Sequence, residues 1–370
     1  MKILFTDFTL PYLLKDSSYP VGGWAVELNS WINGLRVNGH EVGVLTWKGA
    51  NAFVNKKLDF DLIETYDPDK GIKILKYFYY YIPEQYKKAK NYAPDVIIQA
   101  CSGIATGIMS FIANKLRVPF IYRVANDMDA DQRYRTRLLK YEQIAYKYGL
   151  KKTDVILCQN SYQYDNLKIK FPEKSLHILH NPFLKTHDTN IYSFEDRKYV
   201  AWLGVFQKQK NLSLLYKIAK QVPEINFKIA GMPGNSMDND TQNALKNLKE
   251  LSNIGFVGYL PRKQVPSFLS NAACLLNTSH YEGFSNTYLE AFSAGTPVIA
   301  PVNADPDHII KKNGLGFAVK NNSDFPVVIQ GVFENKEKFV EISKQCQKYV
   351  YKNHNPEILA KRLVDIIRNL

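Results

Sequence analysis

The sequence predicts an α/β protein made of two doubly wound parallel-sheet domains. Short apolar runs typical of buried strands alternate along the chain with longer segments of helical periodicity. A polar stretch at residues 182–197 interrupts this alternation before a new apolar run begins. A chain of 370 residues with 45% hydrophobic content is long enough for two cores. We therefore expect a first domain at residues 1–185 and a second at residues 193–355.

In the first domain the expected strands are short runs rich in β-branched and aromatic residues. They are Lys2–Phe5, Glu41–Thr46, Asp95–Gln99, Pro119–Val124, Asp154–Cys158 and Leu176–Leu179. The segments between them that show helical periodicity are Trp24–Val37, Gly103–Lys115, Gln132–Tyr148 and Tyr162–Lys170.

The second domain repeats the pattern. Its expected strands, again separated by helices, are Tyr199–Leu203, Phe227–Ala230, Gly255–Val257, Ala273–Leu276 and Val298–Ala300. Open parallel sheets bind ligands at the carboxyl ends of their strands, so we expect a binding cleft where the two domains face each other.

The most informative segment of the second domain carries two glutamates eight positions apart, Glu282 and Glu290. Ser285 is a suitable N-cap, and Gly295, followed closely by a proline, is a suitable helix end. The spacing therefore predicts a helix over roughly Asn286–Ala294, with Glu282 in the preceding loop and Glu290 inside the helix.

The predicted helix is apolar almost all round, so Glu290 should be buried, and a buried carboxylate needs a partner. Two interpretations stay open: the partner is a ligand hydroxyl, or Glu290 caps a neighbouring loop. The N–H groups at the helix N-terminus can bind phosphate or sugar oxygens. Glu282 could then accept hydrogen bonds from a hexose, and Glu290 from a ribose diol. The residues that carry these N–H groups are Gly283, Phe284, Ser285, Asn286 and Thr287.

This segment resembles a known family signature. Glu282-Gly283-Phe284-Ser285-Asn286, followed by Leu289-Glu290-Ala291 and Gly295-Thr296-Pro297-Val298, is similar to the E-x7-E motif of retaining glycosyltransferases of the GT-B fold, family GT4. The resemblance covers nearly the whole chain and implies two Rossmann-like domains that face each other across a cleft. It implies a nucleoside diphosphate sugar as substrate, with no metal or other cofactor, and a C-terminal helix at 356–370 that packs on the first domain.

The loop after the first strand of the second domain departs from the family pattern. The family has Gly-Arg followed five residues later by Lys, all near the donor phosphates; here Gly204 and Lys210 match, while Val205 replaces the arginine. Valine cannot make the bidentate hydrogen bonds of a guanidinium. Either Lys208 compensates from the same loop, or activity is reduced or absent. A solvated basic turn is the other interpretation of these lysines.

Two glycine motifs have alternative interpretations of about equal weight. Gly258-Tyr259 resembles the family's nucleobase-lining loop, or is a turn that ends a strand. Gly22-Gly23 resembles the loop where substrates approach the backbone, or is a plain turn before a helix. We place the first pair on the donor side and the second on the acceptor side.

The segment Arg123 to Asp131 follows a buried strand and contains an Asp-x-Asp spacing. We favour acceptor contact or helix capping over a metal site here. Asp127 is the acceptor-side candidate, and Arg123 is its expected ion-pair partner or else an anion binder. Together with Glu282 and Lys210, Asp127 completes the candidate catalytic residues.

Net charge of +13 points to acidic partners. No nucleic-acid recognition module is visible, so we expect none to bind, and an anionic membrane or a lipid-linked acceptor fits better. Residues 73–88 interleave aromatic and basic side chains, as an interfacial segment would; a core strand followed by a solvated helix start is the alternative.

The cysteines are scattered along the chain and are expected to be reduced thiols; they are Cys101, Cys158, Cys274 and Cys346. There is no transmembrane-length run or signal peptide, so a cytoplasmic protein is expected, with contact to the inner membrane face left open.

The resemblance implies a hexosyltransferase that moves a sugar from a UDP- or GDP-linked donor to a glycan or lipid-linked acceptor, with retention, in cell-surface polysaccharide synthesis. Two alternatives remain: a nucleotide-sugar epimerase of the same architecture, and a non-catalytic binding subunit that lost turnover with the arginine at position 205.

Overall fold

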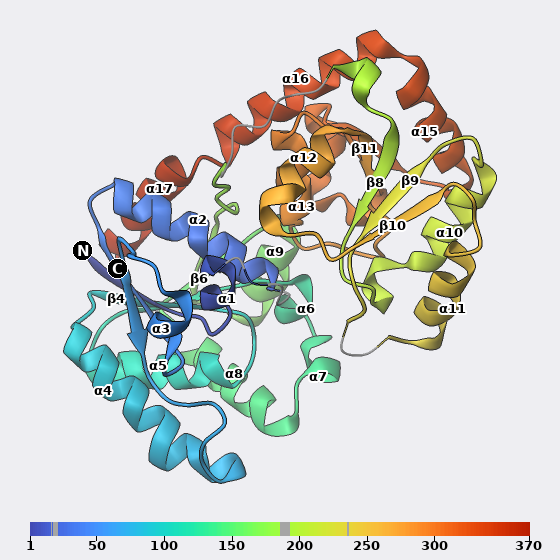
Figure 1. The fold of residues 1–370 in the computed structure, drawn as a ribbon. Coiled ribbons are helices and arrows are strands. Elements are labelled where there is room, and N and C mark those ends of the chain that lie inside the picture. The colour runs from blue at the N-terminus through green and yellow to red at the C-terminus, as the bar shows by residue number, and fades with distance from the viewer. Residues whose placement is uncertain (16, 18–20, 186–192, 235–236) are drawn as a thin grey trace. The chain divides into compact units, whose positions relative to one another are not determined.

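The computed structural model describes residues 1–370 except 16, 18–20, 186–192 and 235–236 (Figure 1). The chain forms two compact units: unit 1 comprises Met1–Leu184 and His354–Leu370, and unit 2 comprises Lys185–Asn353. Part of the predicted domain boundary, residues 186–192, lies outside the described residues.

Unit 1 contains a seven-stranded parallel sheet in the order β3-β2-β1-β4-β5-β6-β7. The strand order reverses between β1 and β4, which is where a doubly wound sheet opens its crevice. The strands are β1 Lys2–Thr6, β2 Glu41–Thr46, β3 Asp61–Glu64, β4 Val96–Ala100, β5 Phe120–Arg123, β6 Val155–Cys158 and β7 Ser175–Ile178.

Helices cover both faces of this sheet. One apolar core lies under α2 and α17, and the other lies under α4, α5, α8 and α9. The helices are α1 Leu10–Leu14, α2 Gly23–Val37, α3 Ala50–Val54, α4 Ile82–Tyr92, α5 Ile104–Leu116, α6 Asp127–Ala130, α7 Tyr134–Arg137, α8 Lys140–Lys152, α9 Ser161–Lys170 and α17 Pro356–Arg368. A 3₁₀ turn (η1, Lys73–Leu75) and a π-helical turn (η2, Tyr77–Tyr81) precede α4.

Two expectations about the secondary structure of unit 1 are wrong. The predicted helix Gln132–Tyr148 is divided into α7 and α8, because the Glu142 side chain accepts the backbone N–H of Leu139 at 2.9 Å and starts a new helix there. The core strand that was the alternative for residues 73–88 does not form, since η1, η2 and α4 make this segment helical.

The final helix, α17, packs against α2. Asn38 at the end of α2 donates to the carbonyl of Glu357 at 2.9 Å. A side chain on Gly34 of α2 would meet the Pro356 carbonyl oxygen at 2.2 Å, so only glycine permits this approach. The start of α17 is therefore tightly packed against α2 within unit 1.

His354 precedes α17 and is fully buried, and its Nδ1 lies 2.7 Å from the Asn181 carbonyl oxygen. Burial lowers its pKa to about 3 from 6.5 in spite of that hydrogen bond. Below about pH 6.5 the unfolded chain protonates this histidine, while the folded chain keeps it neutral. The free energy of unfolding therefore decreases as pH falls from about 6.5 toward 3.

We therefore expect unit 1 to lose about 2 kcal/mol of unfolding free energy between pH 6.5 and pH 5 because of His354 alone. Urea unfolding at several pH values measures it, and His354→Gln should flatten the profile. The control His177→Gln, on the half-buried His177 of β7, should leave the slope unchanged. Equal slopes for wild type and His354→Gln would contradict the assignment.

Unit 2 contains a six-stranded parallel sheet in the order β10-β9-β8-β11-β12-β13. Its strands are β8 Tyr199–Leu203, β9 Phe227–Ala230, β10 Ile254–Gly258, β11 Ala272–Leu276, β12 Val298–Pro301 and β13 Gly316–Val319. Its helices are α10 Leu212–Gln221, α11 Asn239–Leu248, α12 Val265–Ser270, α13 Asn286–Ser293, α14 Ile309–Asn313, α15 Phe325–Glu334 and α16 Lys336–Asn353. The prediction of two parallel α/β domains is thus confirmed.

The four cysteines are free thiols, as expected. Among the described residues, no helix combines the length and the apolar character needed to cross a bilayer.

Candidate active site

Glu282 lies in the loop between β11 and α13 and is 8% exposed. Three donors meet at its Oε1: Lys210 Nζ at 2.6 Å, Ser279 Oγ at 2.7 Å and Asn277 Nδ2 at 3.2 Å. Among the described residues, Oε2 receives no hydrogen bond. The loop therefore holds the carboxylate through one of its two oxygens.

The electrostatics of Glu282 keep it ionised. Burial raises the pKa of this carboxyl, but the charge of Lys210 and the three hydrogen bonds outweigh burial, so the pKa lies below its ordinary value. An ionised Glu282 accepts hydrogen bonds and does not donate them, which suits recognition of hydroxyl groups.

Lys210 comes from the loop that joins β8 to α10, in a 3₁₀ turn at Lys208–Lys210. The loop passes close to the end of β9: a side chain on Gly231, whose φ is +154°, would lie 1.9 Å from the Gly204 carbonyl oxygen. Gly231 was not identified from the sequence, although a glycine directly after a strand is a recognisable signal. In the same loop Lys208 and Val205 are exposed.

Glu290 lies inside α13, as predicted, and its side chain is 5% exposed. Its Oε1 forms an ion pair with Nη2 of Arg262, which precedes α12. Its Oε2 is buried without a hydrogen-bond partner among the described residues. Arg262 was not identified from the sequence, because it is distant from the motif along the chain.

The ends of α13 agree only in part with the predicted caps. Gly295 has a φ of +66° and follows the helix end, as expected. Ser285 stands at the N-cap position, but its side chain makes no capping bond to the helix; its Oγ lies 2.6 Å from Thr287 Oγ1. Of the other predicted donor-side residues, Gly283 is buried, and Phe284 and Asn286 are half-buried at the start of the helix.

The predicted base-side glycine, Gly258, ends β10 with a φ of +76°, a conformation that favours glycine. Its carbonyl accepts the N–H of Gly231 at 2.8 Å, which joins this loop to the end of β9. Tyr259 follows as a half-buried residue. The carboxyl ends of β8, β9, β10 and β11 thus bring all the predicted donor-side segments to one edge of the sheet.

On the acceptor side, the expected pairing of Arg123 with Asp127 is wrong. Arg123 is 1% exposed, and its Nε lies 2.9 Å from Oε1 of Glu27 on α2. Its other nitrogens donate to the Cys158 and Leu179 carbonyls and to Asn181 Oδ1. All three nitrogens are used inside unit 1, so Arg123 is a structural residue and not an anion binder.

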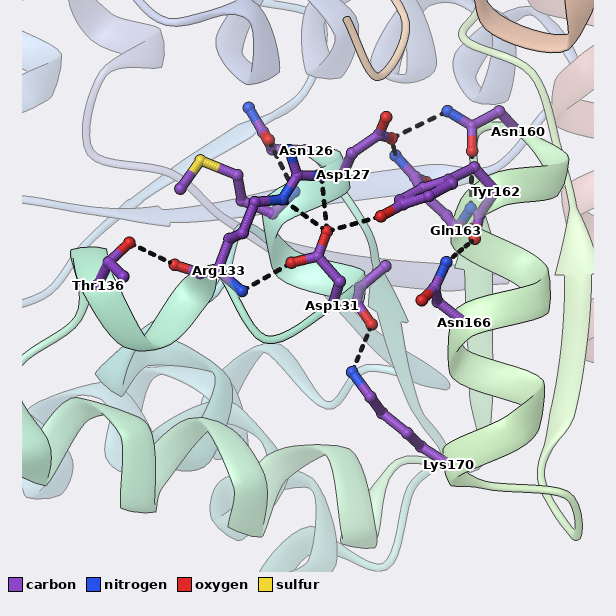
Figure 2. Close-up of polar contacts among 12 residues, drawn as sticks. Asn126, Asp127, Asp131, Arg133, Thr136, Asn160, Tyr162, Gln163, Asn166 and Lys170 are labelled. Atoms are coloured by element: carbon purple, nitrogen blue, oxygen red, sulfur yellow. Dashed lines mark hydrogen bonds and ion pairs between the residues drawn. The ribbon is translucent and has the colours of Figure 1, made fainter. Parts of the chain in front are cut away.

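Asp127 instead accepts hydrogen bonds from two amides of α9's N-terminus, Asn160 Nδ2 at 3.0 Å and Gln163 Nε2 at 2.9 Å (Figure 2). Both bonds go to Oδ1. Burial raises the pKa of Asp127, and the two amides oppose the rise only in part. Figure 2 also shows Asp131 bound to Arg133 and Tyr162. The aspartates of this segment thus bind neighbouring side chains, and no group of three or more metal-ligand residues occurs in the described part of the chain.

Gly22 and Gly23 stand at the start of α2. Gly22 is its N-cap, with extended backbone, and a side chain there would meet nothing within 4 Å. Their predicted role in substrate approach remains a prediction.

Two doubly wound α/β units, each built on a parallel sheet, are the architecture of the GT-B fold. Comparison with solved structures agrees: HepE of Anabaena, in complex with UDP-glucose, has a TM-score of 0.74 at 14% identity, with 100% of both chains covered. Sucrose-phosphate synthase of Thermosynechococcus elongatus has a TM-score of 0.72 at 16% identity, over 100% of this chain and 98% of that one.

Residues 185–353 match the family model "Glycosyl transferases group 1". The matched residues correspond to unit 2, which is thus similar to a group 1 glycosyltransferase domain. The alpha-monoglucosyldiacylglycerol synthase of Streptococcus pneumoniae is 22% identical over 82% of this chain and 74% of that protein. The 2-deoxystreptamine N-acetyl-D-glucosaminyltransferase of Niallia circulans is 24% identical over 51% of this chain and 48% of that protein, so the match spans about half of that relative's length.

Proposed function

We propose that this chain transfers a sugar from a UDP- or GDP-linked donor to a hydroxyl of a glycan or lipid-linked acceptor, with retention, in cell-surface polysaccharide synthesis. One observation carries the proposal. Glu282 and Glu290 flank the start of α13, and each is anchored through Oε1 by a cationic side chain while its Oε2 receives no hydrogen bond within the described residues. Two carboxylates prepared in this way fit a ligand with hydroxyl groups at both ends, as a nucleotide sugar has.

The names of similar proteins support this substrate class. HepE was solved in complex with UDP-glucose, and the pneumococcal relative is named alpha-monoglucosyldiacylglycerol synthase. We extend both to this chain as a proposal, including peripheral contact with an anionic membrane at the cytoplasmic face.

Each donor-side residue has a role in the proposal. The Oε2 of Glu290 accepts from the ribose diol, and that of Glu282 from hydroxyls of the transferred sugar. Lys210 and the N–H groups at the start of α13 bind the diphosphate, since both are positive. Gly258 and Tyr259 line the base.

In the proposed reaction, an acceptor oxygen forms a bond to the anomeric carbon on the face that the nucleotide leaves. The bond from that carbon to the phosphate oxygen breaks, and the acceptor proton passes to the departing diphosphate oxygen. The protein holds the reactants in position and stabilises the growing negative charge through Lys210. Neither a metal nor another cofactor is part of the proposal.

Val205 supports a second candidate, a binding subunit without turnover. Val205 is 38% exposed in the loop that carries Lys210. Because this residue is a valine, position 205 has no guanidinium to bind the diphosphate. Such a protein would bind the nucleotide sugar and release no product.

Calorimetric titration with UDP, GDP, ADP and their sugar conjugates tests the proposal, and Glu290→Gln is its sharpest variant. We expect the variant to bind the selected nucleotide about 10-fold to 100-fold more weakly, because the ribose loses a hydrogen bond to a charged group. The wild type should prefer the ribonucleotide to its 2′,3′-dideoxy analogue, and the variant should lose this preference.

Glu337→Gln, at an exposed position of α16, is the matched control and should bind like the wild type. Equal affinity of Glu290→Gln and the wild type would remove Glu290 from the ribose role. Binding of none of these nucleotides would reject the donor site itself.

A further inference from the structure

We propose that unit 2 carries a second ligand site, which binds a small sugar monophosphate. The site is a pocket of about 300 Å³ at the amino ends of β8, β9 and β10, which are neighbouring strands of the sheet (Figure 1). The proposed donor site lies at the carboxyl ends of the same strands. The five residues of β8 separate its two ends by roughly 13 Å, at about 3.3 Å per residue, so the pocket is separate from the donor site.

Two lysines give the pocket its positive charge. Lys198 precedes β8 and Lys228 belongs to β9; both are exposed, and both line the pocket. Nζ of Lys228 lies 4.2 Å from the centre of the Tyr199 ring, and this contact holds the cation at the pocket wall. Within the described part of the chain neither lysine forms an ion pair, and none of the residues that line the pocket is acidic. Both charges can therefore meet an anion.

The side chain of Asn253 is buried in the pocket wall in a fixed orientation. Asn253 is 6% exposed. Its Nδ2 donates at 3.0–3.1 Å to three carbonyl oxygens, those of Ala219, Val222 and Ile225. Only the nitrogen of the amide can face three acceptors, so the positions of nitrogen and oxygen are determined.

This orientation leaves one acceptor of Asn253 for a ligand. Its backbone carbonyl is already used, since it accepts the N–H of Phe227 at 2.8 Å. Its Oδ1 lies on the other side of the amide from the three carbonyls, and no donor among the described residues bonds to it. Because Asn253 lines the pocket, Oδ1 is the acceptor that it offers there. A ligand hydroxyl is a suitable donor.

Gly255 of β10 leaves space in the pocket beside Lys228. An added side chain would meet nothing closer than the Phe227 carbonyl oxygen at 3.6 Å and Lys228 Cγ at 4.0 Å. Gly255 is also not among the glycines with positive φ. Neither packing nor backbone conformation thus requires glycine at this position. A glycine inside a strand often marks a place that a ligand approaches closely.

These groups together fit a sugar with one phosphate. The phosphate can meet both lysines. Asn226 and Ser252, which are exposed at the pocket, add to Asn253 the neutral polar groups that bind hydroxyls. Inorganic phosphate would leave most of these neutral groups unused. The volume is at the lower end of the range for ligand pockets, so one sugar ring with one phosphate fits better than a nucleoside diphosphate sugar.

Calorimetric titration of the full chain tests the proposal, with glucose 6-phosphate, mannose 6-phosphate and glucose 1-phosphate as probes. We expect at least one of them to bind at least about tenfold more tightly than inorganic phosphate, because the sugar hydroxyls add hydrogen bonds. Glucose should bind at least about tenfold more weakly than that sugar phosphate, because it lacks the charge that meets the lysines.

Two variants test the location of the ligand. Lys198→Gln combined with Lys228→Gln should weaken sugar phosphate binding at least about tenfold. Gly255→Val should weaken it as much, because the added side chain enters the space beside Lys228. Valine suits a strand, so the melting temperature of this variant should not fall. The control is Lys344→Gln combined with Lys348→Gln on two exposed lysines of α16, and it should bind like the wild type.

Competition separates this site from the donor site. Nucleotides should not displace the sugar phosphate, and the result does not depend on whether the chain is a transferase. The proposal is overturned if no sugar phosphate binds, if a nucleotide displaces it, or if inorganic phosphate or glucose binds as tightly. It is also overturned if the double lysine variant or Gly255→Val binds like the wild type, or if the α16 control loses as much binding.

Discussion

Replacing Lys210 by methionine is expected to lower the rate of donor cleavage about 10²-fold to 10³-fold. In the proposed mechanism Lys210 is the side-chain cation that meets the departing diphosphate, and loss of one preorganised charge-stabilising group costs about 3–4 kcal/mol of transition-state stabilisation. The position at 205, where the family has a second cation, is valine. No guanidinium from that position is present to share the charge.

The structure adds a second reason for a large effect. Lys210 Nζ lies 2.6 Å from Glu282 Oε1, and its charge is the main factor that lowers the pKa of this buried carboxyl. Without Lys210, Glu282 keeps only Ser279 and Asn277 as partners, so its pKa should rise. The variant should therefore also lose sugar recognition as pH falls through a range where the wild type retains it.

The measurement is release of the nucleoside diphosphate from the nucleotide sugar that titration selects, with a panel of glycan and lipid acceptors. Lys217→Met, at an exposed position of α10, makes the same change of charge and should retain the wild-type rate. A Lys210→Met enzyme with the wild-type rate would contradict its role at the diphosphate. Tight binding without any product from the wild type would instead favour the binding-subunit candidate.

Much of the proposed donor site could be predicted because its residues are close in sequence. Glu282, Ser285 and Glu290 all belong to one strand-loop-helix segment, and its apolar flanks, spacing and terminal glycine define the element from local pattern alone. The structure places Glu282 in the loop and Glu290 in the helix, as that pattern predicts. Their bound roles remain part of the proposal.

The partners of these residues could not be predicted, because they come from distant segments. Arg262 reaches Glu290 from the loop before α12, and Lys210 reaches Glu282 from the loop after β8. Ion pairs between segments depend on how strands are ordered in the sheet. Arg123 shows the resulting error: we expected Asp127, four positions away, as its partner, but its partner is Glu27, 96 positions away.

The missed strands have a similar explanation. β3 (Asp61–Glu64) and β13 (Gly316–Val319) are edge strands of their sheets. β3 has a charged residue at each end, so it is not the continuous apolar run that marks a central parallel strand. β13 is a short apolar run, and our prediction missed it. The division at Leu139 was also missed, because one side chain that caps a new helix leaves the helical periodicity of the sequence almost unchanged.

Glu27→Leu is expected to destabilise unit 1 by about 3–5 kcal/mol. Glu27 and Arg123 are 2% and 1% exposed, so removal of the carboxylate leaves a guanidinium charge buried without compensation. Two further donors lose their acceptor: Trp31 Nε1, at 3.0 Å from Oε1, and Gln159 Nε2, at 3.2 Å from Oε2. Arg123 cannot turn to water, because its other nitrogens hold the carbonyls of Cys158 and Leu179.

Urea unfolding followed by tryptophan fluorescence measures this loss. Unit 1 contains Trp24, Trp31 and Trp47, while Trp202 lies in unit 2. A Trp202→Phe background therefore reports unit 1 alone, and Trp31, whose indole donates to Glu27, should also change its native fluorescence.

The control is Glu41→Gln, which removes the exposed ion pair with Lys2, 3.6 Å apart, from the same unit. Exposed pairs contribute little, so the control should lose less than about 1 kcal/mol. If Glu27→Leu is no less stable than this control, the pair is not the fixed link between α2 and β5 that its geometry indicates.

Adding Arg123→Met to Glu27→Leu should recover only part of the loss in unfolding free energy. The double variant removes the stranded charge, but it also leaves the carbonyls of Cys158 and Leu179 without the donors that Arg123 supplies.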